Sequence, residues 1–143
     1  MSTPHQQIEQ SAWYLNPIVE IKGVRHALIM TLDGMVVARS AELPVDEADG
    51  IAAMTSALHA ASRSAANTAL GAPEATPVET VTVQNAYGTY MVMPAGIRTN
   101  TLIAVSGDAD MPMGVVAHTM ARQAKKLGEQ LMSVPVRSDD NAS

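Results

Sequence analysis

A single long helix dominates this sequence. Pro44 precedes it, and Gly71 is placed to end it in a left-handed conformation. We therefore predict a helix over Val45–Leu70, with Asp46 and Asp49 in a carboxylate version of the box that starts many helices. At ~1.5 Å per residue this helix is about 39 Å long. That length is similar to the diameter of a compact domain of 143 residues, so the helix crosses the whole molecule.

The predicted helix carries apolar residues on two stripes. Nine of its residues are alanine, and its charged side chains are few. One stripe consists of Ile51, Met54, Leu58, Ala61 and Ala65, and the other consists of Ala48, Ala52, Ala66 and Leu70, interrupted by Thr55, His59 and Ser62. One apolar stripe packs on the sheet of the same chain, whereas two stripes need two coverings, and a second copy of the chain supplies the second most simply. The alternative is that alanine is abundant only because it is the best helix former.

The rest of the chain predicts five strands and two further helices. Apolar runs between turn residues give strands over 24–32, 35–39, 78–84, 89–93 and 100–105. Asp33-Gly34 is typical of a hairpin whose type I′ turn needs positive φ at both residues. Helical spacing gives a first helix over 7–21, with a kink or a restart at Pro17, and a last helix that ends at Met132. The fold class is therefore α+β, in the order α-β-β-α-β-β-β-α, with a five-stranded antiparallel sheet and helices on both faces.

The strand predicted over 78–84 is a candidate edge of this sheet. At an edge, its unpaired backbone groups can join the same strand of a second copy across a two-fold axis. Glu79 and the nearby Pro77 are equally typical of residues that protect an edge from such pairing. The sequence alone leaves both interpretations open.

Composition excludes several classes of function. The absence of cysteine excludes a disulfide scaffold, a thiol nucleophile and a cysteine metal site. Nine basic side chains are scattered along a chain of net charge −5, which disfavours nucleic acid and anionic membranes as partners. No apolar run approaches the ~20 residues of a membrane helix. We expect a soluble, cytoplasmic protein with one domain over 7–132, flexible tails at 1–6 and 133–143, and membrane association only through partners.

Motifs of catalysis or cofactor binding are absent from the sequence. It contains no G-x-x-x-x-G-K-[ST], no G-x-G-x-x-G and no G-x-S-x-G. The four histidines (5, 26, 59 and 118) lie on different predicted elements without H-x-x-x-H spacing. Asp108 and Asp110 precede a helix, where carboxylates are far more often caps than a metal pair. We predict no catalytic residues, no cofactor and no metal.

An ordered set of segments resembles the roadblock/LC7 family, whose fold is profilin-like. The resemblance extends from about Ile8 to Met132, and Pro17 departs from the continuous first helix of the family. The matching segments are Ala12–Leu15, Gly23–Leu28, Asp33–Ala38, Asp46–Leu58, Tyr90–Met93, Leu102–Val105 and Met113–Ala117. The phrase Gly23-Val-Arg-His-Ala, with the Asp-Gly hairpin and the alanine-rich helix, resembles the actinobacterial branch. Members of that branch are encoded beside a sensor kinase and a small GTPase in clusters called conservons.

The resemblance implies a homodimer built through the long helix and the third strand. It also implies a non-catalytic regulator or platform for a Ras-like small GTPase, with a sensor histidine kinase as a further candidate partner. The interface residues that it implies are Ile51, Met54, Thr55, Leu58, Ala61, Ser62, Ala65, Val78, Thr80 and Thr82. An inserted arginine can stabilise the transition state of GTP hydrolysis, and Arg98 is the only loop arginine that we would test as a GTPase contact.

A small-molecule sensor is the alternative function. Profilin-like folds host ligand pockets, and a fold does not determine a function. Methionines such as Met30, Met35, Met91 and Met93 can line a plastic pocket, or they can fill the core in place of the missing aromatic residues.

Overall fold

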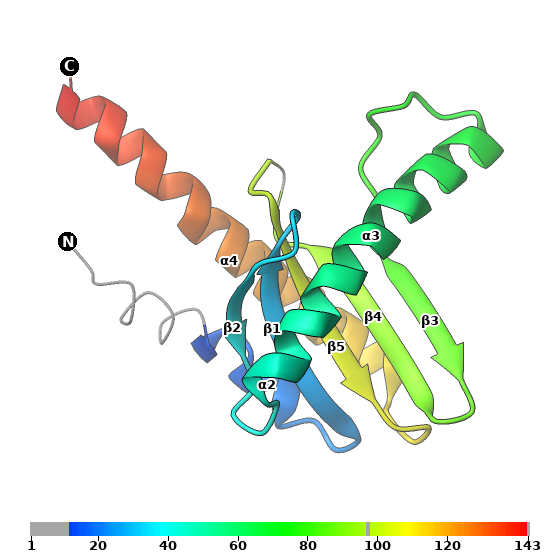
Figure 1. Cartoon of the computed structure of the whole chain (residues 1–143). Coiled ribbons are helices and arrows are strands. Elements are labelled where there is room, and N and C mark those ends of the chain that lie inside the picture. The colour runs from blue at the N-terminus through cyan, green and yellow to red at the C-terminus, as the bar shows by residue number, and fades with distance from the viewer. Residues whose placement is uncertain (1–11, 97, 143) are drawn as a thin grey trace.

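The computed structural model describes residues 12–96 and 98–142, and it describes 133–142 by their backbone alone. Its helices and strands follow the predicted order along the chain (Figure 1). They are α2 (Asn16–Val19), β1 (Val24–Thr31), β2 (Val36–Arg39), α3 (Val45–Leu70), β3 (Val81–Asn85), β4 (Gly88–Pro94), β5 (Thr101–Gly107) and α4 (Met113–Ala142).

The five strands form one antiparallel sheet in the order β2-β1-β5-β4-β3. β1 and β5 are neighbouring inner strands, and Ile29 of β1 pairs with Ile103 of β5. Most side chains of these two strands are buried on both faces of the sheet, which requires a layer of helices on each side. β2 and β3 form the two edges, so the third strand does lie at an edge as the sequence allowed.

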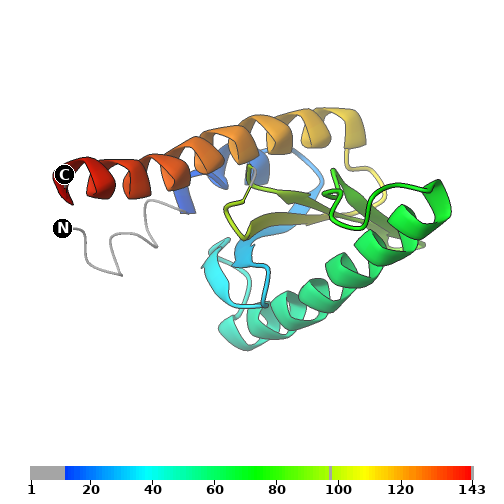
Figure 2. The same ribbon diagram turned by 90° about the horizontal axis from the view of Figure 1, so that it is seen from above.

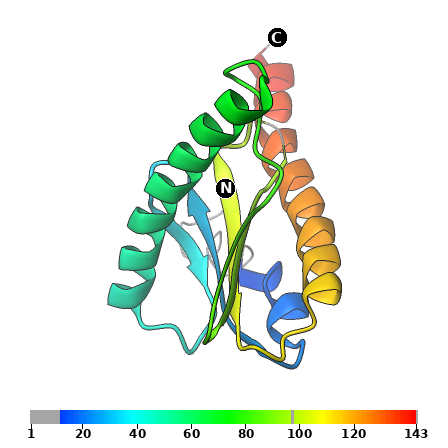
Figure 3. The same cartoon turned by 90° about the vertical axis from the view of Figure 1, so that its right-hand side faces the viewer.

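Helices cover the two faces unequally. α4 and the short α2 lie on one face and α3 lies on the other (Figures 2 and 3). The core under α2 and α4 is the larger and contains Ile18, Ile103 and Met120. The core under α3 contains Leu102 together with small residues of the helix.

The first helix restarts at Pro17, as predicted. Leu15 is the N-cap of α2 and Pro17 lies in its first turn. Proline is tolerated there because a backbone N–H in the first turn has no acceptor within the helix. Residues 7–11 of the predicted helix and the predicted tail at 1–6 lie outside the described residues.

The hairpin at Asp33-Gly34 is confirmed, but its predicted turn type is wrong. Gly34 has a φ of 93°, whereas Asp33 is not among the described residues with positive φ. The N–H of Gly34 donates to the carbonyl of Thr31 (3.0 Å), and the N–H of Thr31 donates to the carbonyl of Met35 (2.8 Å). The connection is therefore a three-residue loop that needs only one left-handed residue, not a two-residue type I′ turn.

α3 has the predicted bounds, and Gly71 ends it with a φ of 68°. Its predicted starting box is wrong, because Pro44 is the N-cap and no side chain caps the helix. Asp46 and Glu47 instead lie inside the first turn, where negative charge is favoured by the helix dipole.

α4 continues to Ala142, ten residues beyond the predicted end at Met132. The predicted change from helix to an aperiodic chain at Ser133 is therefore wrong for the backbone of 133–142. The mobility of this segment stays a prediction. Asp108 does not cap α4, since its Oδ1 accepts the N–H of Asp110 (2.9 Å) and closes a local turn.

Candidate functional site

Only the N-terminal half of α3 packs on the sheet of its own chain. Ala48, Ala52 and Thr55 are buried there, and Ile51 and Leu58 are half-buried beside them. α3 packs mainly on β1 and β2, while its C-terminal half extends away from the sheet (Figures 1 and 3). The stripe that includes Ala48 and Ala52 therefore supplies the contact within the chain.

The other stripe of α3 is largely uncovered. The side chain of Met54 is 68% exposed, and Ala61 and Ala65 are exposed further along the helix. Ser62, which the family resemblance placed in the interface, is half-buried. We call the exposed side of Met54, Ala61 and Ala65 the outer stripe. An apolar stripe of this kind on a solvent-facing helix is typical of a surface that binds another protein.

Asn67 anchors the C-terminal half of α3. Its side chain is only 8% exposed, and its Nδ2 donates to the carbonyls of Glu74 (3.1 Å) and Thr76 (3.0 Å). These bonds hold the connector between α3 and β3 against the helix. The part of α3 that extends beyond the sheet is thus tied to the strand that forms the sheet edge.

A cavity of about 410 Å³ lies between α3 and the sheet. We call it the sheet cavity, and it is lined by His26, Leu28, Ile51, Met54, Thr55, Leu58, Tyr90, Ala104 and Ser106. The hydroxyls of Thr55 on α3 and Tyr90 on β4 are 2.5 Å apart and share a hydrogen bond at the wall of this cavity. Burial raises the pKa of Tyr90 above its ordinary value, and the bond to Thr55 opposes this shift.

Sequence reasoning missed the polar wall of the sheet cavity. His26, Ser106 and Tyr90 lie side by side because the register pairs Ser106 with both of the others. The Nδ1 atom of His26 is buried without a hydrogen-bond partner. Alternation within each strand places these residues on the α3 face, but only the strand pairing brings them together.

The free edge of β3 lies on the same side of the molecule as the overhanging half of α3 (Figure 1). Val81 is buried, and the next four residues of the strand are exposed. Val81 and Val83 pair with Val92 and Tyr90 of β4. Because backbone groups alternate along an antiparallel strand, Thr82 directs its N–H and C=O away from β4, toward the unpaired edge.

β3 begins at Val81, so the prediction of a strand from Val78 is wrong. The N–H of Ala95 donates to Thr101 on β5 (2.8 Å), and alternation then turns the nitrogen of Pro94 toward β3. Proline has no N–H to donate, so the ladder between β3 and β4 cannot continue opposite Pro94. Val78 and Thr80 therefore lie outside the strand, in the connector.

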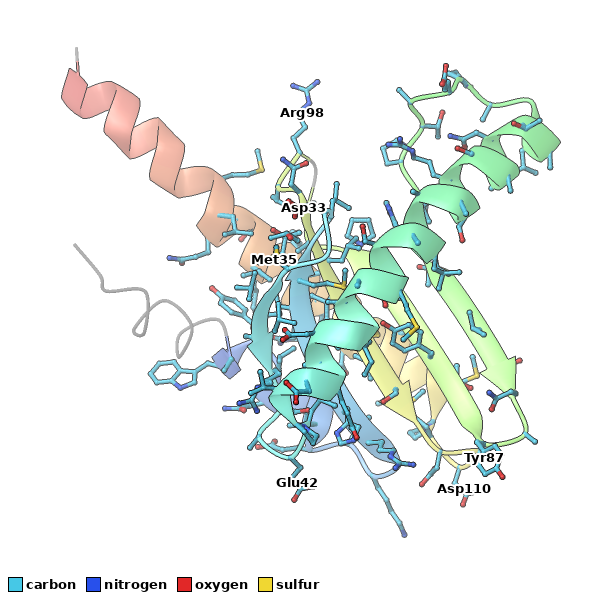
Figure 4. The ribbon with its side chains drawn as sticks, viewed as in Figure 1. Asp33, Met35, Glu42, Tyr87, Arg98 and Asp110 are labelled. Atoms are coloured by element: carbon cyan, nitrogen blue, oxygen red, sulfur yellow. The ribbon has the colours of Figure 1, made fainter. Side chains whose placement is uncertain are left out.

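Val78 lies instead beside a second hollow, at the end of the sheet that carries the β4–β5 loop. This hollow of about 780 Å³ is bordered by α3, the connector, the β4–β5 loop and α4, and Arg98 lines it. Arg98 is exposed, with a φ of 64°, and its side chain points away from the body of the molecule (Figure 4). Arg98 and the outer stripe of α3 are therefore two separate surfaces.

The methionines divide between core and surface. Met30 and Met91 are buried in the core, and Met93 is buried and also reaches the second hollow. Met35 is 64% exposed. Methionine thus mainly takes the place of aromatic residues in packing.

The described part of the chain contains neither clustered metal ligands nor a membrane-spanning helix. Within residues 12–96 and 98–142, no three side chains of the types that hold a metal ion come together. Burial and the positive charge of Arg63 lower the pKa of His59 below its ordinary value. None of the helices in this part of the chain combines the length and the hydrophobicity that a membrane crossing requires.

Comparison with known proteins assigns the family. The sequence model of the Roadblock/LC7 domain matches residues 14–106, which is more than half of the chain. The chain therefore belongs to the Roadblock/LC7 domain family, and the expected fold is confirmed. No curated protein sequence matches the chain.

Solved structures share this fold. A Roadblock/LC7 domain from Streptomyces avermitilis is 26% identical, with a TM-score of 0.74, over 85% of this chain and 97% of that domain. The gliding protein MglB from Thermus thermophilus is 21% identical, with a TM-score of 0.75, over 93% and 94% of the two chains. Profilin IA from Acanthamoeba castellanii is 15% identical, with a TM-score of 0.51, over 90% and 98%.

Proposed function

We propose that this protein is a non-catalytic, cytoplasmic regulator that acts as a homodimer and binds a Ras-like small GTPase in a bacterial signalling complex of the conservon type. The observation that carries the proposal is the exposed apolar outer stripe of α3 beside an unpaired sheet edge. Membership of the Roadblock/LC7 family supports it. A sensor histidine kinase is a further candidate partner, through which the complex would reach the membrane.

The proposed dimer uses two elements at once. Thr82 and its neighbours on β3 pair with the same strand of the second copy, which makes one continuous sheet. The outer stripe of α3 then packs against the second copy, with Ile51, Met54 and Leu58 at the mouth of the sheet cavity. Self-association has a precedent in this fold, since MglB has been solved in a tetrameric arrangement.

The proposed GTPase contact includes Arg98. It stands on an exposed loop, away from the proposed dimer interface. A guanidinium there can pair with carboxylates of the partner or stabilise charge near the nucleotide.

The proposal is tested by capture of the Ras-like GTPase that a conservon would encode beside this protein, loaded in turn with GDP and GTP. We expect the wild-type chain to retain the GTPase in at least one nucleotide state. We expect Met54→Glu, which places a charge on the outer stripe, to abolish the dimer and to weaken capture at least tenfold.

Val115→Glu is the matched control, because Val115 is similarly exposed (55%) but lies on α4. It is expected to leave the dimer and capture unchanged. Failure of the wild-type chain to capture the GTPase in either state would refute the proposed partner. A Met54→Glu protein that remains dimeric would refute the interface.

A small-molecule sensor is the second candidate function. The sheet cavity favours it, because its walls are mainly apolar and the buried Nδ1 of His26 has no partner there. Native mass spectrometry of freshly purified protein separates the two functions. A co-purified small ligand would favour the sensor, and a bare dimer would favour the GTPase regulator.

A further inference from the structure

The second hollow concentrates positive charge in an otherwise acidic protein. Its basic side chains are Arg63 of α3, Arg98 of the β4–β5 loop and Lys125 of α4, while Glu79 is the one acidic residue of the lining. His59 also lines the hollow, but burial and Arg63 lower its pKa, so it adds little positive charge near pH 7. The whole chain has a net charge of −5. We call this site the basic hollow.

The cations of the basic hollow are not neutralised by neighbouring carboxylates. Within the described part of the chain, Arg63, Arg98 and Lys125 have no acidic group within ion-pair distance. Several cations that border one concave site and outnumber its acidic groups, here Glu79 alone, raise the local concentration of anions. The hollow is thus arranged to attract an anion.

The walls of the basic hollow are mainly apolar. They include Leu32, Pro77, Val78 and Met93, and the small side chains of Ala121 and Ala124 keep the α4 side open. At about 780 Å³ the hollow has the size of a small-molecule site. A simple inorganic anion would contact only the cations and leave these walls in water.

We propose that the basic hollow binds a soluble organic anion that has an apolar body and a phosphate or carboxylate head, with the head held between Arg63 and Lys125. A soluble ligand is favoured over a membrane lipid because the protein as a whole, with a net charge of −5, repels an anionic bilayer. Arg98 contributes less, because its side chain points away from the body (Figure 4). The proposal does not depend on the GTPase or on the dimer.

Such a ligand would connect elements that otherwise have little contact. α3 in this region extends beyond the sheet and is tied to the connector by Asn67. A head group between Arg63 of α3 and Lys125 of α4 would join the two helical layers across the end of the sheet. Binding therefore raises the stability of the folded chain, because the ligand binds the folded state only.

The test is calorimetric titration of the full chain with octyl phosphate, octanoate, inorganic phosphate and octanol. We expect one saturable site for octyl phosphate, with inorganic phosphate and octanol each bound at least tenfold more weakly. Arg63→Gln and Lys125→Gln are each expected to weaken octyl phosphate about tenfold, since a charge-assisted hydrogen bond is lost.

Lys126→Gln is the matched control, since Lys126 is the exposed neighbour of Lys125 and does not line the hollow. We expect it to leave the affinity within twofold. An NMR titration adds an independent readout, because an anion beside Arg63 should raise the depressed pKa of His59.

Three outcomes would overturn the proposal. Octanol that binds as tightly as octyl phosphate would show a purely apolar site. An equal loss in Lys126→Gln would show attraction by overall charge. Binding to phosphatidylglycerol vesicles without binding to octyl phosphate would show a membrane surface instead of a soluble ligand.

Discussion

At the scale of single residues, the side chain of Asn67 holds a whole segment of the chain in place. It lies near the C-terminus of α3, where most neighbouring side chains are exposed, yet it is buried. Its amide satisfies two carbonyls of the connector that have no strand partner. The residue thus replaces ladder hydrogen bonds in a segment that cannot join the sheet.

We predict that Asn67→Ala lowers the free energy of unfolding by about 1–3 kcal/mol, because it removes two part-buried hydrogen bonds that are worth about 0.5–1.5 kcal/mol each. Chemical denaturation followed by circular dichroism measures this loss. Thr68→Ala is the control, since Thr68 is the exposed neighbour on the same turn. Equal stability of the two variants would contradict the anchoring role of Asn67.

At the scale of elements, α3 and β3 are each incomplete within one chain. α3 covers only part of its sheet face, and β3 is paired along one side only. Both features lie on the same side of the molecule, so one partner can complete both. A long edge strand without such a partner is a hazard for aggregation.

We predict that Thr82→Pro dissociates the dimer while the monomer stays folded. The N–H of Thr82 faces the free edge, so proline removes a donor that no strand of the same chain uses. Analytical ultracentrifugation measures the dimer, and thermal unfolding measures the fold.

Val83→Pro is the comparison for this element. The N–H of Val83 faces β4, so the same substitution one residue later should lower the melting temperature by several degrees. A Thr82→Pro protein that dimerises as tightly as the wild type would argue against pairing through β3.

At the scale of the whole molecule, the surfaces have different physical character. The outer stripe of α3 and the edge of β3 offer apolar area and backbone hydrogen bonds, whereas the basic hollow offers charge. Salt screens interactions of the second kind much more than those of the first. A rise in ionic strength therefore weakens ligand and partner contacts at the basic hollow but leaves the dimer intact.

We predict a dimer of twice the 15.0 kDa chain mass that persists when salt is raised from about 0.1 M to about 1 M, as the Debye length falls from ~10 Å to ~3 Å. Light scattering after gel filtration measures the mass. Dissociation in high salt would indicate an interface held by charges, in conflict with the apolar interface proposed above.

Local signals in the sequence were sufficient for the elements. The bounds of α3 follow from Pro44 and Gly71, which act on the backbone within a few residues. The restart at Pro17 and the Asp-Gly hairpin were predicted on the same basis. The sequence alone also shows two apolar stripes on α3, because helical periodicity does not depend on what covers the helix.

Tertiary structure decided what depends on residues that are distant in the chain. Pro94 on the neighbouring strand β4 sets the start of β3, and the strand register assembles His26, Ser106 and Tyr90 into one wall. The basic hollow likewise joins Arg63 to Lys125 from opposite layers. No local sequence pattern predicts these long-range contacts, because strand pairing and helix placement are determined by the packing of the whole chain.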